Sequence, residues 1–328
     1  MGIDDLRSFD DDADAGLIDR YLWERRGPAD KQTLELERRL RPLRYRHMPL
    51  ILPDRSQGRR WPALAASIAI LLGFGISAAP RESASMWEVS VLAGAPKLQS
   101  RALSAATRLG VGQWLSTDGG ASARISNAEL GAVSVQPGSR LRLLNAERRR
   151  HRMELARGRI EATINAPPRL FFVNTPSGVA ADMGCQYQLE VDDAGVSSLR
   201  VTLGYVALSN RGVESMVPAG ASCRTRPGQT PDVPHYDDAP DALVSALTDW
   251  QARPQEAAMI DSVLARARPR DAMTVWHLLA RVPPDRRDKV AARLAQLVPP
   301  PDDVRLADAL RLDRAALDGW WRRIFYGW

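Results

Sequence analysis

The side chains best suited to catalysis are few in this sequence and stand far apart. The four histidines are scattered along the chain: His47, His151, His235 and His277. No HExxH, GxSxG or P-loop spacing brings a metal ligand, a nucleophile or a phosphate cradle together. Adjacent carboxylates such as Asp192 and Asp193 fall in expected turns, where they usually cap backbone groups. The sequence therefore predicts that the protein is not an enzyme.

Carbohydrate-active enzymes are the alternative class that these residues leave open, because they need only two carboxylates facing each other across a cleft. Metal binding is not predicted. Asp10, Asp12 and Asp14 resemble the start of a calcium loop, but its sixth and twelfth positions hold Ala15 and Tyr21 in place of Gly and Glu. We expect no metal ion and no cofactor.

Positive charge exceeds negative charge by six, with 45 Lys and Arg against 39 Asp and Glu. The basic residues are nearly all arginines and are spread along the chain, whereas binding to nucleic acid needs a coherent basic patch. Direct contact with nucleic acid is therefore not predicted.

One uncharged segment, residues 61–79, has the composition of a membrane span. Its helical length would be roughly 28 Å, about the thickness of the hydrocarbon core of a bilayer. Six arginines occupy the 20 residues before it, and only Arg81 and Lys97 occur in the 20 residues after it. Because basic residues near a span tend to stay in the cytoplasm, the N-terminus is expected inside and the bulk of the chain in the periplasm.

Two alternatives to this anchor stay open. The small residues Ser77, Ala78 and Ala79 resemble a cleavage site, so a cleaved signal peptide is the main one, although its n-region would be some 60 residues long. A buried helix of a soluble domain is the other.

Residues 1–60 are expected to form a cytoplasmic arm of two short helices, separated at Gly27 and Pro28. Helices this short are marginal in water, so their apolar stripes should bury against each other or dock in the groove of a cytosolic partner. A solvated stalk is the alternative. The candidate partner-binding residues of the two stripes are Leu17, Tyr21, Leu22, Leu34 and Leu40.

Beyond the span, glycine-punctuated alternating segments predict an all-β module. In residues 159–165, Ile160, Ala162 and Ile164 share one face, as in a half-buried strand. A β-sandwich and a short β-helical stack both fit the loose repeat. Other expected strands are 132–135, 140–144, 170–173, 186–191, 199–203 and 205–209.

After a proline-rich joint near residues 231–240, the pattern returns to helices. Apolar residues recur at helical spacing, and Pro283-Pro284 and the three prolines at 299–301 separate the segments. Helices are expected over 241–252, 255–267, 271–281, 285–297 and 304–325, the last with a break near Leu312. A stripe of tryptophans including Trp276 and Trp320 is interpreted as core packing.

Five short motifs, in order and at fitting intervals, resemble the FecR-type domain, named for the iron-dicitrate transport regulator. They are VGQWLST at 111–117, VQPGS at 135–139, ELARG at 154–158, FVNTP at 172–176 and VPAG at 217–220. The resemblance implies a single-span inner-membrane protein whose periplasmic part receives a signal from an outer-membrane or periplasmic protein. It also implies a cytoplasmic part that controls an extracytoplasmic-function sigma factor.

Cys185 and Cys223 are the only cysteines, and both follow the predicted span. An even number outside the cytosol suggests one disulfide, and both residues fall at strands or turns of the FecR-like region. Closing this 39-residue loop would stabilise the fold by roughly 3 to 4 kcal/mol. Two buried free thiols are the alternative.

These inferences define a multidomain membrane protein with a helical arm, one transmembrane helix, an all-β module and a C-terminal α-helical domain. The function expected is signal transduction by a FecR-type regulator. The alternative is a structural protein whose β-module grips an envelope polymer or protein. The expected divisions are 1–60 (arm), 61–79 (span), 80–106 (periplasmic linker and first strand), 107–230 (FecR-like module) and 231–328 (helical domain).

Overall fold

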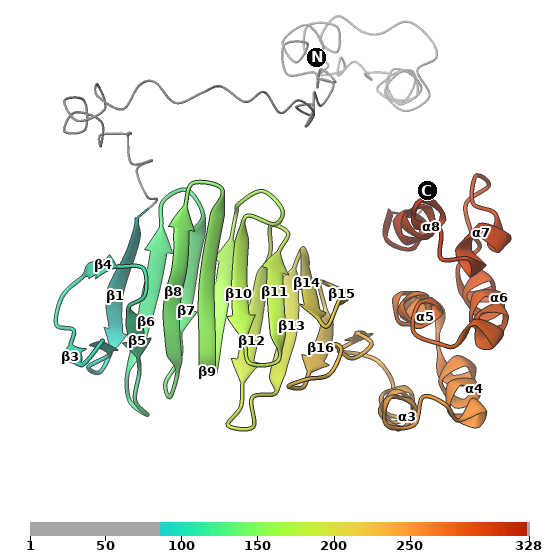
Figure 1. The fold of residues 1–328 in the computed structure, drawn as a ribbon, viewed down its shortest axis with the longest axis horizontal. Coiled ribbons are helices and arrows are strands. Elements are labelled where there is room, and N and C mark those ends of the chain that lie inside the picture. The colour runs from blue at the N-terminus through green and yellow to red at the C-terminus, as the bar shows by residue number, and fades with distance from the viewer. Residues whose placement is uncertain (1–85, 327–328) are drawn as a thin grey trace, which may run out of the picture. The chain divides into compact units, whose positions relative to one another are not determined.

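The computed structural model describes residues 86–326 (Figure 1). The expected arm with its stripe residues, the expected span at 61–79 and the terminal Trp328 lie outside the described residues. Within residues 86–326, none of the helices combines the length and hydropathy that crossing a bilayer requires.

Strands β1 to β17 form two layers that share β9. Layer A contains, in spatial order, β4 (Thr107–Leu109), β1 (Trp87–Ala93), β6 (Ser122–Asn127), β7 (Gly131–Val135), the second half of β9 (Arg150–Ile164), β12 (Gln186–Val191), β13 (Ser197–Leu203), β16 (Ala221–Thr225) and β17 (His235–Tyr236). Layer B contains β3 (Arg101–Ala102), β2 (Lys97–Leu98), β5 (Trp114–Ser116), β8 (Arg140–Glu147), the first half of β9, β10 (Phe171–Thr175), β11 (Gly178–Asp182), β14 (Tyr205–Asn210) and β15 (Val213–Pro218).

Strand β9 passes from layer B to layer A at Gly158. Its residues up to Arg157 pair with β8, and those from Gly158 onward pair with β12. Gly158 has a φ of 86°, and a Cβ there would lie 2.4 Å from the Cα of Ser139. Because only glycine tolerates both the positive φ and this close approach, the crossing depends on Gly158.

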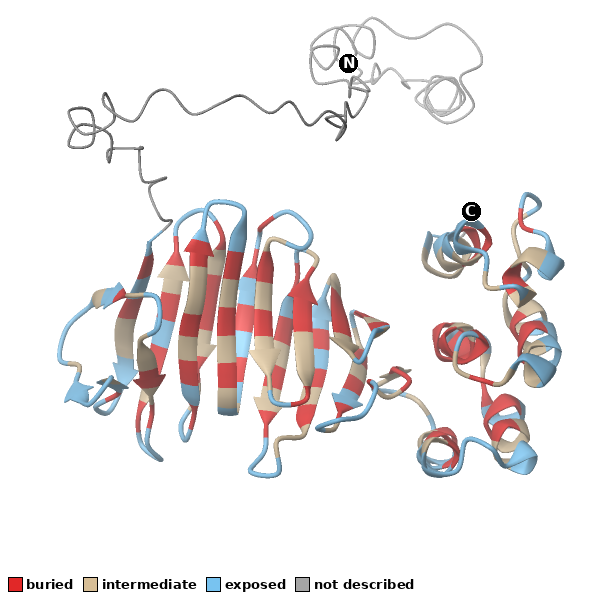
Figure 2. Cartoon of the chain, in the orientation of Figure 1, coloured by how far each residue is buried: buried red, intermediate tan, exposed pale blue. Residues whose placement is uncertain are grey.

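Apolar side chains alternate along the strands, so each layer turns one face inward, as the red and pale bands of Figure 2 show. Ile125 and Val133 of layer A and Leu141 and Leu155 of layer B are fully buried in one cluster. The layers therefore pack face to face. Apart from the β9–β10 pair, the pairings among the described strands are antiparallel, which resolves the two open alternatives in favour of a sandwich.

The C-terminal part is helical, as the sequence predicts, and prolines precede or follow most of its helices. Helix α3 begins and ends where predicted, and Leu312, with a φ of 60°, breaks the last helical stretch. The helices have their own core, in which Val275, Val290 and Trp320 are fully buried. They are α3 (Asp241–Ala252), α4 (Ala257–Arg266), α5 (Ala272–Leu279), α6 (Arg287–Leu297), α7 (Leu306–Leu310) and α8 (Arg314–Tyr326), with 3₁₀ turns at Pro269–Asp271 and Pro284–Arg286.

The segment expected as a linker and first strand holds β1, β2 and β3, and β1 pairs with both β4 and β6. Trp87 of β1 is 1% exposed and contacts Phe171 of layer B, with ring centroids 5.7 Å apart. The sandwich therefore begins with the first described strand.

Candidate functional site

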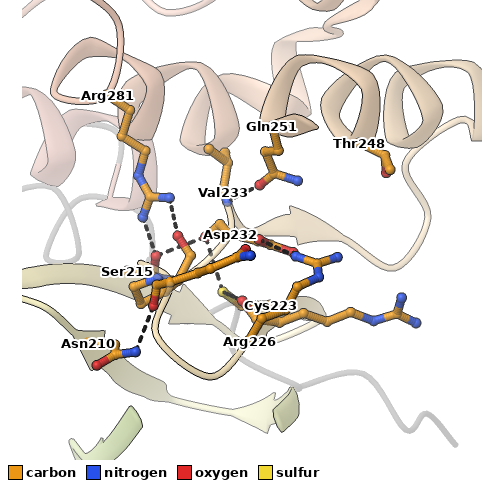
Figure 3. A network of polar contacts seen from close by, with 12 residues as sticks. Asn210, Ser215, Cys223, Arg226, Asp232, Val233, Thr248, Gln251 and Arg281 are labelled. Atoms are coloured by element: carbon orange, nitrogen blue, oxygen red, sulfur yellow. Dashed lines mark hydrogen bonds and ion pairs between the residues drawn. The ribbon is translucent and has the colours of Figure 1, made fainter. Parts of the chain in front are cut away.

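The sandwich and the helices meet at a connecting strap, residues 226–238, which runs between β16 and α3. Figure 3 shows polar side chains from β14, β15 and β16 below the strap, and from α3 and from Arg281, which follows α5, above it. The strap's backbone bonds to both sides: the Val233 amide donates to Gln251 Oε1 at 2.7 Å, and Thr274 Oγ1 donates to the Pro234 carbonyl at 2.9 Å. Because its polar contacts join the helices to the sandwich, we take this junction as the candidate functional site.

Arg281, just after α5, supplies the central cation of the junction. Its guanidinium donates hydrogen bonds to the carbonyl oxygen of Pro231 and to Ser215 Oγ of β15. Burial lowers the pKa of this guanidinium, while Cys223 and Asp232 act in the opposite direction. An arginine nonetheless keeps its charge at any physiological pH. The helices are thus joined to the sandwich by a half-buried positive charge.

Asp232 provides the nearest carboxylate on the strap. It pairs with Arg226 through hydrogen bonds of 2.9 and 3.0 Å, and its carbonyl oxygen accepts from Ser215 Oγ at 3.0 Å and from the Cys223 thiol at 3.2 Å. Burial raises the pKa of Asp232, and Arg226 opposes this shift. The strap is therefore held by charge-assisted and neutral hydrogen bonds together.

His277 of α5 makes the other polar contact between helix and sandwich. Its Nε2 lies 3.0 Å from the carbonyl oxygen of Met216, which identifies Nε2 as the donor. Complete burial lowers the pKa of His277 to about 3, and the nearby Arg281 adds to the effect. The imidazole is therefore neutral at physiological pH and cannot act as an acid–base group there.

Two cavities flank the strap. One, of about 410 Å³, lies between the outer face of layer A and α3, and Arg200, Arg224 and Thr248 are among its lining residues. The other, of about 590 Å³, is lined by Trp250, Trp276 and Arg281 among others. Neither contains an arrangement of nucleophile and base. Among residues 86–326, no group of three His, Cys, Asp or Glu side chains is placed to hold a metal ion. The polar contacts of the junction join the strap to both the helices and the sandwich.

Asp182 and Cys185 form a second buried cluster, where the chain passes from β11 to β12. The Cys185 thiol donates to Asp182 Oδ2 at 2.5 Å, and the Gly184 amide donates to Oδ1 at 2.7 Å. Burial raises the pKa of Asp182 to about 6, although both hydrogen bonds oppose the shift. The hydroxyl of Tyr187, nearby, is buried without a hydrogen-bond partner. This carboxylate is retained in the core at an energetic cost.

The predicted disulfide between Cys185 and Cys223 is wrong for this structure, because both are free, buried thiols. Cys223 of β16 pairs with Leu199 of β13, which pairs with Leu189 of β12, and Cys185 precedes Leu189 by four residues. Two strand spacings across and four residues along give a separation of roughly 16 Å. A disulfide requires Cα atoms within about 7 Å. The alternative of two apolar thiols is the correct one.

Neither Arg281 nor its partners were predicted as site residues, because Ser215 and Pro231 precede Arg281 by 66 and 50 residues. The only signal in the sequence was a single arginine after the apolar segment 272–279. An arginine at that place is also common in ordinary surface helices. The interpretation of the tryptophan stripe as core packing agrees with the structure. Trp320 is fully buried, and Trp276 packs on Trp321 with ring centroids 4.7 Å apart.

Comparison with protein families places a known domain in the sandwich. Residues 113–207, from just before β5 into β14, match the family model described as FecR protein. The chain therefore contains a FecR domain, as its motifs indicated. The junction with the helices lies on the C-terminal side of the matched residues.

Two crystal structures of a candidate anti-sigma factor from Parabacteroides distasonis resemble this chain. Each has 14% sequence identity and a TM-score of 0.34, and they cover 41% and 42% of this chain. The chain spans 64% and 63% of those chains, under two thirds of their length. No curated protein matches the sequence.

Proposed function

We propose that this protein is a membrane-anchored signal-transducing regulator of FecR type. The observation that carries the proposal is the FecR domain at residues 113–207, which follows an uncharged segment long enough to span a bilayer. In this arrangement the sandwich and the helices lie in the periplasm, where they sense or dock a periplasmic or outer-membrane protein, and residues 1–60 lie in the cytoplasm.

The junction supports a sensing part that moves as one unit. Arg281, His277 and Thr274 each bond the helices to the sandwich or its strap, and Met273 of α5 belongs to the apolar core of the sandwich. A signal received on either part would therefore act on both.

The cytoplasmic arm is the proposed output, with an extracytoplasmic-function sigma factor as its partner. Its stripe residues are apolar and have no evident core of their own, which suits a helix docked in a partner's groove. The structural alternative, an envelope-binding protein, assigns the arm no partner.

Capture of a sigma factor by the full-length chain tests the output. Full-length protein solubilised in detergent should co-purify with a sigma factor produced from the same genome. The double variant Leu22→Asp and Leu40→Asp should lose capture while it still fractionates with membranes. A matched control, Ser8→Asp with Gln32→Asp, adds the same charge outside the stripes and should retain capture. Equal capture by both double variants would refute the docking role of the stripes.

Reporter fusions test the topology separately. A reporter fused after Pro80 should behave as periplasmic, and one fused at Arg55 as cytoplasmic. Reversed reporters would overturn the orientation, and a soluble periplasmic protein cut near Ala79 would establish the signal-peptide alternative.

A further inference from the structure

One end of the sandwich gathers exposed apolar side chains and unpaired arginines where the described chain begins. We call it the proximal end and define it by Trp87, the first residue of β1. Next to Trp87, a row of residues paired in register crosses layer A, and the loops that adjoin these residues share the proximal end. The row contains Glu88, Ser126, Ala132, Thr163, Gln186 and Leu203.

Large apolar side chains are exposed at this end. Six such residues are exposed between residues 86 and 326, and four of them are Met86 (52%), Val111 (61%), Leu203 (58%) and Tyr326 (51%). Met86 precedes Trp87, and Leu203 ends the row across layer A. Scattered exposed apolar residues are ordinary, but a concentration at one end marks an interaction surface.

Val111 and Tyr326 also lie at the proximal end, as the positions of neighbouring residues show. Val111 follows Leu109, the register partner of Trp87, by two residues. Tyr326 follows Phe325, whose ring packs on Tyr205 at 5.6 Å, two residues beyond Leu203. In Figure 1 the start of β1 and the end of α8 accordingly lie along the same upper edge.

Three consecutive arginines project from the same end. Arg148 and Arg149 form the turn between β8 and β9, Arg150 begins β9, and all three are exposed. The next residue, His151, accepts a hydrogen bond from Trp87 Nε1 at 3.3 Å, which fixes the turn beside the start of β1. No carboxylate forms an ion pair with these arginines in the described part of the chain, although Glu147 flanks the turn.

The distance to the predicted span is short. Residue 86 follows residue 79 by seven positions, and a fully extended chain of that length reaches no more than roughly 25 Å. The proximal end is therefore the part of the sandwich that the chain itself holds nearest to the bilayer. Arginines at such a surface bind lipid phosphates, and neighbouring apolar side chains enter the headgroup boundary.

We propose that the proximal end is a lipid-binding surface that docks on anionic phospholipid headgroups of the membrane in which the chain is anchored. Arg148, Arg149 and Arg150 contact the phosphates, and Val111, Leu203 and Tyr326 enter the headgroup layer. This inference rests on the proposed membrane anchor. It adds that the periplasmic part rests on the bilayer surface instead of being held off it by the linker.

The test uses the full-length chain in lipid nanodiscs. A cysteine at Val111→Cys, or at Leu92→Cys toward the opposite end of β1, carries an environment-sensitive fluorophore; Cys185 and Cys223 are buried and stay unlabelled in the folded protein. Discs of phosphatidylcholine alone are compared with discs that also contain phosphatidylglycerol, each with a nitroxide-bearing lipid as quencher. We expect several-fold stronger quenching of the label at position 111 in the anionic discs, and no such change at position 92.

Charge reversal provides the matched control. The triple variant Arg148→Glu, Arg149→Glu and Arg150→Glu should abolish the extra quenching. A second triple variant, with the exposed Arg101, Arg124 and Arg157 changed to Glu, alters the net charge equally and should retain it.

Three outcomes would overturn the proposal. Equal quenching at positions 111 and 92 in protein that enters the discs would refute lipid docking but leave the anchor intact. Equal quenching at position 111 in neutral and anionic discs would refute the assignment to anionic lipid. Failure of the chain to enter the discs would refute the anchor, and the docking surface with it.

Discussion

Arg281, two residues after α5, donates a hydrogen bond to Ser215 Oγ in the middle of β15, so the helices and the sandwich share one half-buried cation. The same guanidinium also bonds the strap at Pro231. Because an unpaired buried charge or acceptor is costly, each of these groups depends on the others.

Replacing Arg281 by Met should destabilise the protein by about 2 to 4 kcal/mol, because Ser215 and the Pro231 carbonyl lose a donor and Asp232 loses a compensating charge. Chemical denaturation followed by near-ultraviolet circular dichroism measures the change. The control Arg253→Met removes an ion pair with Glu256 in which both side chains are about half exposed, and it should change stability by less than about 0.5 kcal/mol. Equal effects of the two variants would show that the buried network does not hold the junction.

Acid should destabilise the protein through His277. The pKa of this residue is about 3 when folded because of its burial, whereas that of an unfolded histidine is about 6.5. The unfolded state therefore binds more protons between these values, and stability should fall as the pH drops from about 6.5 toward 3. His277→Gln, which can still donate to the Met216 carbonyl, should flatten the dependence of the unfolding free energy on pH in this range. An unchanged slope would show that other titratable groups, and not His277, cause it.

Asp182 should change the stability of the protein with pH in the opposite direction to His277. Its pKa is raised from 3.8 to about 6 by burial, so the folded state takes up a proton more readily than the unfolded state. The associated stability is present below pH 4 and is lost as the pH rises through 6. Asp182→Asn, which keeps an acceptor for the Gly184 amide, should therefore raise the free energy of unfolding at pH 7.5 by about 1 to 2 kcal/mol. The exposed control Asp193→Asn should have no such effect. A destabilised Asp182→Asn variant would contradict the conclusion that the buried Asp182 carboxylate lowers the stability of the fold.

Local patterns predicted the elements of this fold well. Strand β12 has the predicted limits because Tyr187, Leu189 and Val191 alternate with polar residues, and Pro240 sets the start of α3. The first half of β9 was missed, although His151, Met153 and Leu155 alternate in the same way. The residues between them, Arg152 and Glu154, are charged and only half-buried, so the segment did not show the apolar content expected of a strand.

Contacts between distant segments could not be predicted in the same way. The distance between Cys185 and Cys223 depends on β13 lying between β12 and β16. The residues of β12 and β16 alone do not determine that order. The partners of Arg281 and the neighbours of Arg148 to Arg150 likewise come together only through the register of whole sheets. The pattern of apolar residues therefore predicts which face of a helix or strand is buried, whereas the order of the strands determines which residues that face contacts.

The two cysteines should titrate as free thiols in protein that has never been reduced. Cys185 is 2% exposed and Cys223 is 1% exposed, and burial raises the pKa of both thiols, that of Cys223 to about 12. Because the thiolate is the reactive form, both should react slowly with a thiol reagent in the folded protein and fully in guanidinium chloride.

We expect two thiols per denatured chain, and one in each of the single variants Cys185→Ser and Cys223→Ser. A count of zero in the denatured, unreduced chain would mean that a disulfide forms after all. Since the register holds the two residues roughly 16 Å apart, a bridge within one chain would require a different order of β12 and β16, whereas a bridge between two chains would not. Digestion of the unreduced chain followed by mass spectrometry would then distinguish an internal bridge from one between two chains.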